Sequence, residues 1–97
     1  MYSREGRKVT TEIKAIKDII EKLKRVPGLA AELPDTADIL DGVGLDSLEL
    51  LQFMLELEER LGIQIDFDKL EYSYLRSIQT LAEFLETMPS RAPARLD

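Results

Sequence analysis

The 97-residue chain contains no cysteine and no histidine. The first absence excludes disulfides and cysteine-ligated metals, and the second removes the usual proton shuttle at neutral pH. We therefore expect a protein that is not an enzyme. Long apolar runs are also missing: no stretch approaches the roughly 20 residues that span a bilayer, and the start, MYSREGRK, lacks the apolar segment of a secretion signal. The sequence thus predicts a cytoplasmic protein that does not bind membranes.

Charge is distributed unevenly along a chain that is long enough for one domain. Residues 1–26 hold 8 basic and 4 acidic side chains, residues 27–89 hold 3 and 14, and residues 90–97 hold 2 and 1, giving a net charge of −6. Because an acidic surface repels nucleic acid and anionic lipid, the expected partners are basic protein surfaces. The alternative is that the acidic residues only confer solubility.

The N-terminal part of the chain has the apolar spacing of a helix. This spacing predicts a first helix over residues 11–26, ended by the stretch VPG. The apolar residues that recur at this spacing are Val9, Ile13, Ile16, Ile20 and Leu23. Residues 27–45 have no period, two prolines and three glycines, so we expect a long ordered loop with a short turn near Ala30. Five apolar residues should pack this loop on the core: Leu33, Ile39, Leu40, Val43 and Leu45.

Two further main helices are expected in the C-terminal half. The first should run from Ser47 to about Leu61 and end at Gly62, which suits a left-handed cap. The last should be capped by Ser77 and stopped by Pro89, after a short turn around residues 69–74. The apolar residues of the last helix are Ile78, Leu81, Ala82, Leu85 and Met88. The predicted fold is all-α: a small four-helix bundle of three main helices and one short helix, with a long loop between the first two main helices.

This bundle defines the predicted domain organisation. The helical pattern places one domain over residues 9–89. Residues 1–8 and 90–97 are polar or proline-containing and unpatterned, so we expect a mobile N-terminal extension and a mobile C-terminal tail.

The start of the central helix leaves one serine without a structural role. A capping box needs an acid or amide three residues after the cap, and this position is Leu50 if Ser47 is the cap. If Asp46 is the cap, the position is Glu49 and the box closes. The sequence therefore predicts that Asp46 caps the helix and that the Ser47 hydroxyl is free.

The central helix carries more apolar surface than one core contact requires. At about 100° per residue, one stripe should face the core: Leu50, Phe53, Met54, Leu57 and Leu61. A second stripe, Leu48, Leu51 and Leu55, points elsewhere and is flanked by Glu58 and Glu59. A leucine patch among acids indicates a docking surface for basic partners. The alternative is a central helix that is buried on two sides.

A serine at this position could serve three chemistries. A hydrolase elbow requires glycines where Leu45 and Glu49 stand, and no histidine is present to activate the hydroxyl. A calcium loop centred on Gly42 would place Ile39 and Leu48 where oxygen ligands are needed. A covalent attachment point remains, since a phosphate-linked group would be favoured at a helix N-terminus. Regulatory phosphorylation is favoured by the same physics.

The stretch GLDSLELL, followed by LELEERLGIQI, resembles the acyl carrier protein family over about residues 13–85. The resemblance implies that a carrier protein synthase transfers 4′-phosphopantetheine from coenzyme A to Ser47, and that Asp46 helps to position this serine. It also implies that Leu48, Leu51 and Leu55 contact partners, with Glu58 and Glu59 as an acidic rim. The arm would hold acyl groups as thioesters for partner enzymes of fatty-acid, polyketide or related specialised biosynthesis.

Several alternatives remain within and beyond this resemblance. Gln52 stands where many relatives have an acid, which weakens the rim. The segment that contains Phe67, Tyr72 and Tyr74 is longer than in the fatty-acid proteins. Core packing of these aromatic residues is the favoured interpretation, and contact with cargo is the other.

An aminoacyl or peptidyl carrier is one alternative function. A cofactor-free acidic adaptor, regulated by phosphorylation of Ser47, is another. The expected partners are a phosphopantetheinyl transferase and acyl-loading and acyl-transfer enzymes with basic surfaces, and we expect a monomer.

Overall fold

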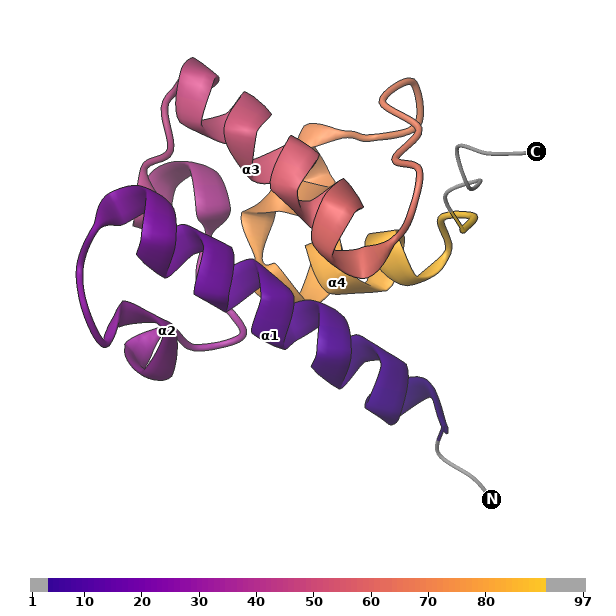
Figure 1. Cartoon of the computed structure of the whole chain (residues 1–97), viewed down its shortest axis with the longest axis horizontal. Coiled ribbons are helices and arrows are strands. Elements are labelled where there is room, and N and C mark those ends of the chain that lie inside the picture. The colour runs from indigo at the N-terminus through magenta and orange to yellow at the C-terminus, as the bar shows by residue number, and fades with distance from the viewer. Residues whose placement is uncertain (1–3, 91–97) are drawn as a thin grey trace.

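The computed structural model describes residues 4–90, with side chains from residue 10 onward, as a bundle of helices (Figure 1). Its elements are α1 (Arg4–Lys24), α2 (Leu29–Glu32), the π-helix η1 (Ile39–Val43), α3 (Ser47–Leu61), the 3₁₀-helix η2 (Tyr72–Arg76) and α4 (Ile78–Glu86). Helix α1 runs diagonally across the bundle and packs against both α3 and α4. The part of the chain that is described has no strand, only an isolated bridge between Ile63 and Ser90. The predicted all-α bundle is confirmed.

Helix α1 is longer than its apolar pattern predicts. It begins at Arg4 instead of residue 11, so residues 4–8 of the predicted N-terminal extension are helical. Apolar periodicity could not predict this extension, because the sequence of residues 4–8, REGRK, has no residue of the apolar pattern. The helix ends at Lys24, before Val26, because Arg25 takes the left-handed conformation at φ 59°. The remaining parts of the predicted mobile ends, residues 1–3 and 91–97, lie outside the described residues.

The core joins one face of each long helix. Its largest fully buried side chains are Ile16, Ile20, Ile39, Phe53, Leu57, Leu75, Ile78, Leu81 and Leu85. No polar or charged residue is buried in the part of the chain that the structure describes. Stability therefore rests on apolar burial. Within residues 4–90, no helix is both long and apolar enough to cross a membrane.

The long connection between α1 and α3 is ordered on the core, as predicted. Ile39 and Leu45 are buried, and Leu33, Leu40 and Val43 are half-buried against the core. The short turn near Ala30 is α2, but η1 was not expected. Its π-helical hydrogen bonding has no apolar period that a sequence could reveal.

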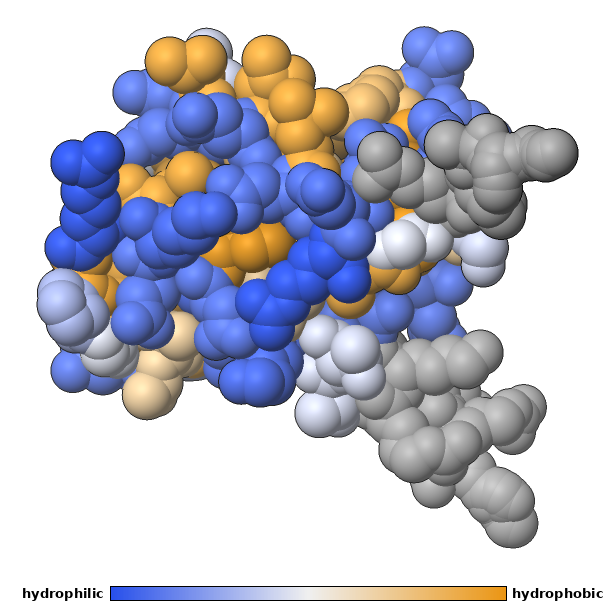
Figure 2. Space-filling model, viewed as in Figure 1, coloured by the Kyte–Doolittle hydropathy of each residue, from blue (hydrophilic) through white to orange (hydrophobic). Residues whose placement is uncertain are grey.

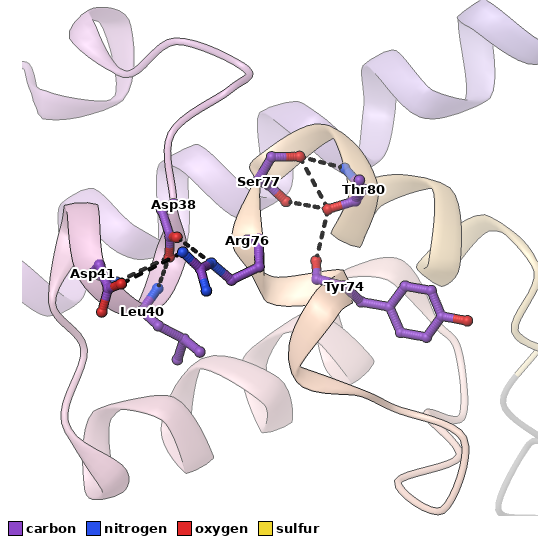
Figure 3. Close-up of polar contacts among 7 residues, drawn as sticks. All are labelled: Asp38, Leu40, Asp41, Tyr74, Arg76, Ser77 and Thr80. Carbon is purple, nitrogen blue, oxygen red and sulfur yellow. Dashed lines mark hydrogen bonds and ion pairs between the residues drawn. The ribbon is translucent and has the colours of Figure 1, made fainter.

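Backbone and side-chain hydrogen bonds tie this connection to the other end of the bundle. The N–H of Ile78 donates to Ala37 O at 3.0 Å. Asp38 Oδ1 accepts the N–H groups of Leu40 and Asp41, at 2.8 and 2.9 Å, and Oδ2 accepts from Arg76 Nε (Figure 3). The N–H of Asp41, together with the guanidinium of Arg76, lowers the pKa of the Asp38 carboxyl. Asp38 thus joins η1 to η2 in its ionised form.

This carboxylate should make the stability of the fold depend on acid pH. Because the folded-state pKa of Asp38 lies below the ordinary value, its stabilising effect is present above about pH 4 and is lost as the pH falls through the folded-state pKa. The variant Asp38→Asn should therefore lose less stability than the wild type between about pH 5 and pH 2. Urea unfolding at each pH measures this, and parallel pH profiles for the two proteins would contradict it.

The C-terminal helix begins as predicted and ends earlier. Ser77 Oγ accepts the N–H of Thr80 at 2.9 Å, and Thr80 Oγ1 donates to Tyr74 O at 3.0 Å (Figure 3). Helix α4 ends at Glu86, so Met88 lies beyond it. The short helix that precedes α4 is also shifted, since η2 covers Tyr72–Arg76 instead of residues 69–74.

Candidate functional site

The N-terminus of α3 is closed by the predicted capping box. Asp46 Oδ1 accepts the N–H of Glu49 at 2.8 Å, and Glu49 Oε1 accepts the N–H of Asp46 at 3.1 Å. The helix ends where predicted, with Gly62 in the left-handed conformation at φ 65°. Asp46 therefore satisfies the helix end, and the serine after it is not needed as a cap.

A lysine of α1 holds the same turn from outside. Lys24 Nζ lies 3.1 Å from Gly44 O and 3.2 Å from Glu49 Oε1. Gly44 has φ 78°, a backbone conformation that favours glycine, so the chain can turn sharply just before the helix. The first turn of α3 is therefore attached to α1 as well as capped by its own residues. No local sequence pattern indicates this contact, because it depends on how α1 and α3 cross.

Ser47 is the first residue of α3 and is exposed. Its hydroxyl makes no hydrogen bond with any residue that the structure describes. No basic side chain among the described residues contacts this oxygen, so those residues leave it accessible and do not activate it. The described residues also contain no group of three or more acids that could hold a metal ion. An exposed hydroxyl on a fixed helix end fits covalent attachment of a phosphate-linked group.

Three leucines of α3 form an exposed row beside this serine. Leu48 is 66% exposed, Leu51 52% and Leu55 51%, whereas Phe53 and Leu57 on the opposite face are fully buried. Hydrophobic side chains gather along the upper edge of the molecule over α3 (Figure 2). The interpretation of α3 as a helix buried on two sides is therefore wrong. We call Leu48, Leu51 and Leu55 the leucine row.

The two acids expected to flank the leucine row differ in their surroundings. Glu59 is exposed and has no partner among the described residues. Glu58 is half-buried, and its Oε2 accepts the N–H of Ile65 at 2.8 Å. Glu58 thus holds the segment after α3, a role that the sequence did not indicate.

The other two glutamates of α3 form ion pairs with α1. Lys22 Nζ lies 2.8 Å from Glu56 Oε1, and Lys24 Nζ lies 3.2 Å from Glu49 Oε1. Arg60 of α3 pairs with Asp18 of α1 at 2.8 Å, which lowers the pKa of the Asp18 carboxyl. The basic character of the N-terminal segment is therefore explained in part by its acidic neighbour α3.

The three aromatic residues before α4 are placed differently from one another. Tyr74 is half-buried and stacks on Phe84, with ring centroids 4.8 Å apart. Phe67 is 49% exposed and Tyr72 77% exposed. Core packing is thus correct for Tyr74 and wrong for Phe67 and Tyr72.

Comparison with known proteins identifies the domain that contains this site. A family model described as the phosphopantetheine attachment site matches residues 17–85. The chain is also similar to an acyl carrier protein of Saccharopolyspora erythraea, with 31% identity over 75 residues, covering 72% of this chain and 74% of the relative. No solved structure matches the chain. The matched region begins within α1, includes the whole of α3 and ends one residue before the end of α4.

Proposed function

Because the chain belongs to the acyl carrier protein family, a family of carriers and not of enzymes, we propose that Ser47 bears its 4′-phosphopantetheine. The family match establishes the cofactor, and the choice of serine is our inference. The observation that carries it is the exposed Ser47 hydroxyl, which has no partner among the described residues and follows a completed capping box. When attached, the arm supplies a terminal thiol that holds an acyl group as a thioester.

The residues around Ser47 would orient the attachment. Asp46 is exposed and directly precedes the serine in the chain, and we propose that it helps the synthase to position the hydroxyl. The contacts of Lys24 with Gly44 and Glu49 keep the serine in one place. The fixed helix end therefore presents one hydroxyl to a modifying enzyme.

The leucine row lies on the same helix and begins at the next residue, Leu48. We propose that it docks partner enzymes, with Glu58 and Glu59 at its edges. Exposed apolar side chains in a contiguous row are typical of interaction surfaces. Weak and rapidly exchanging contacts suit a carrier, because it must release each partner in turn.

The cargo that we propose is an acyl intermediate of fatty-acid, polyketide or related specialised biosynthesis, handled in the cytoplasm. The name of the Saccharopolyspora relative, an acyl carrier protein, favours acyl groups over the aminoacyl or peptidyl alternative. Two differences from the fatty-acid carrier proteins, Gln52 in place of an acid and the longer segment with the exposed Phe67 and Tyr72, favour a specialised carrier.

Incubation with coenzyme A and a promiscuous phosphopantetheinyl transferase tests the attachment. We expect intact-mass spectrometry to show one added phosphopantetheine group on nearly every chain, because the hydroxyl is accessible and held in place. The mass of the protein from its native host provides a second measurement, since the adaptor alternative predicts a phosphate on Ser47. The absence of a phosphopantetheine addition in both measurements would exclude the proposal.

A further inference from the structure

Helix α3 has four glutamates, and three of them are engaged within the protein. Glu49 and Glu56 form ion pairs with lysines of α1, and Glu58 accepts the N–H of Ile65. Only Glu59 makes neither a hydrogen bond nor an ion pair with a described residue. Two of the four negative charges on this helix are therefore already paired with lysines, and a third carboxylate is held by a backbone N–H.

The position of these acids around the helix affects what the leucine row can bind. At about 100° per residue, Glu58 borders the row on one side, and Glu59 and Gln52 border it on the other. The Glu58 carboxylate is turned toward Ile65, and Gln52 carries no charge. The row is thus bordered by one negative charge that has no partner among the described residues.

A basic partner gains little from the engaged acids. To reach Glu56 or Glu49, its side chain must replace a lysine that lies 2.8 or 3.2 Å away, so one surface ion pair is exchanged for another. The three leucines are each about half exposed or more, and their burial has no such competitor. Apolar contact is therefore the larger source of affinity at this face.

We propose that the leucine row fits a partner with an apolar docking groove and one cationic side chain opposite Glu59. This inference rests on the proposed function, in which the row docks partner enzymes. It makes binding depend on leucine burial and only weakly on salt. A groove lined with several cations, which the acidic sequence alone suggests, would meet lysine-neutralised glutamates.

Substitutions in the row and its border test the apolar part. The probe is the promiscuous phosphopantetheinyl transferase with coenzyme A, and the measurement is the KM for the unmodified chain. Leu51→Ala should raise the KM by about fivefold or more, and Glu56→Gln by no more than about twofold. Val26→Ala is the matched control, because Val26 is 47% exposed and lies outside the row, and its KM should equal that of the wild type. Leu55→Ala repeats the test if Leu51→Ala changes the circular dichroism spectrum.

Salt tests the charge part. Between about 0.05 and 0.5 M NaCl, the wild-type KM should rise by less than about threefold. Lys22→Gln frees Glu56 and should give a steeper rise, whereas Lys69→Gln makes the same change in net charge at an exposed lysine without an ion pair and should follow the wild type. Salt also affects the transferase itself. Dividing the KM of each variant by the wild-type KM at the same salt concentration removes this effect.

Two results would overturn this inference: a KM for Glu56→Gln as high as that for Leu51→Ala, or a salt dependence equally steep in the wild type and Lys22→Gln. Either result can occur while phosphopantetheine is still added to the chain, and then only the inference fails. If no group is added to the wild type, the proposed function fails instead.

Discussion

Replacing Ser47 by alanine should abolish phosphopantetheine addition and leave the fold intact. Ser47 stands at the first position of α3, its side chain makes no hydrogen bond with a described residue, and the cap is formed by Asp46 and Glu49. Because alanine is the better helix former, the free energy of unfolding should change by less than about 0.5 kcal/mol. Intact mass after incubation with the transferase, together with urea unfolding, measures both parts.

Ser73 offers a matched control for this substitution. It is also exposed and lies in η2, outside the proposed site. Ser73→Ala should be modified as fully as the wild type. A phosphopantetheine group on the Ser47→Ala chain would instead show that another residue is the attachment point.

The second large effect concerns stability. Phe53 is the largest fully buried side chain and lies on the face of α3 opposite the leucine row. Phe53→Ala removes its contacts and leaves a cavity, so the free energy of unfolding should fall by about 3–5 kcal/mol. Small domains have only about 5–15 kcal/mol in total, so urea unfolding followed by far-UV circular dichroism should show a much lower midpoint.

The exposed Leu55 on the same helix provides the comparison. Leu55→Ala deletes apolar atoms from a side chain that is 51% exposed, so its effect should be within about 1 kcal/mol. Equal losses in Phe53→Ala and Leu55→Ala would mean that α3 buries both faces.

Local chemistry explains why α3 could be predicted from the sequence to the residue. Asp46 and Glu49 are three positions apart, as a capping box requires, and Gly62 supplies the left-handed end. The two apolar stripes also follow from helix geometry alone, which separates Leu51 from Phe53 by about 200°. These features depend on residues within a few positions of one another.

Features that depend on the packing of distant elements could not be predicted in this way. The pairs Lys22–Glu56 and Arg60–Asp18 join residues far apart in the chain, and they form only because α1 and α3 cross where they do. The role of Glu58 likewise depends on the path of the chain after α3. Counting charges in the sequence therefore gives the correct net charge of the acidic part. It does not show how many of those carboxylates are already engaged within the protein and how many could contact a partner.

The end of α4 shows a different limit. Met88 continues the helical spacing of its apolar neighbours, yet the helix stops at Glu86. The N–H of Asp66 donates to Met88 Sδ at 3.3 Å, and Gln64 N–H donates to Pro89 O at 3.0 Å. The segment after α3 thus hydrogen-bonds to this part of the chain, and Pro89 has no N–H with which to continue the helix.

The anchored first turn of α3 sets a dimension for any enzyme that uses this carrier. With the proposed attachment, a flexible arm on Ser47 would explore a sphere whose centre is held by Asp46, Glu49 and Lys24. The leucine row starts one residue from that centre and ends at Leu55, about 12 Å along the helix axis from Ser47. An enzyme that binds the leucine row, as proposed, therefore always has the attachment point at the same distance from its docking groove. The distance between that groove and the enzyme's reactive residues must then match the length of the arm.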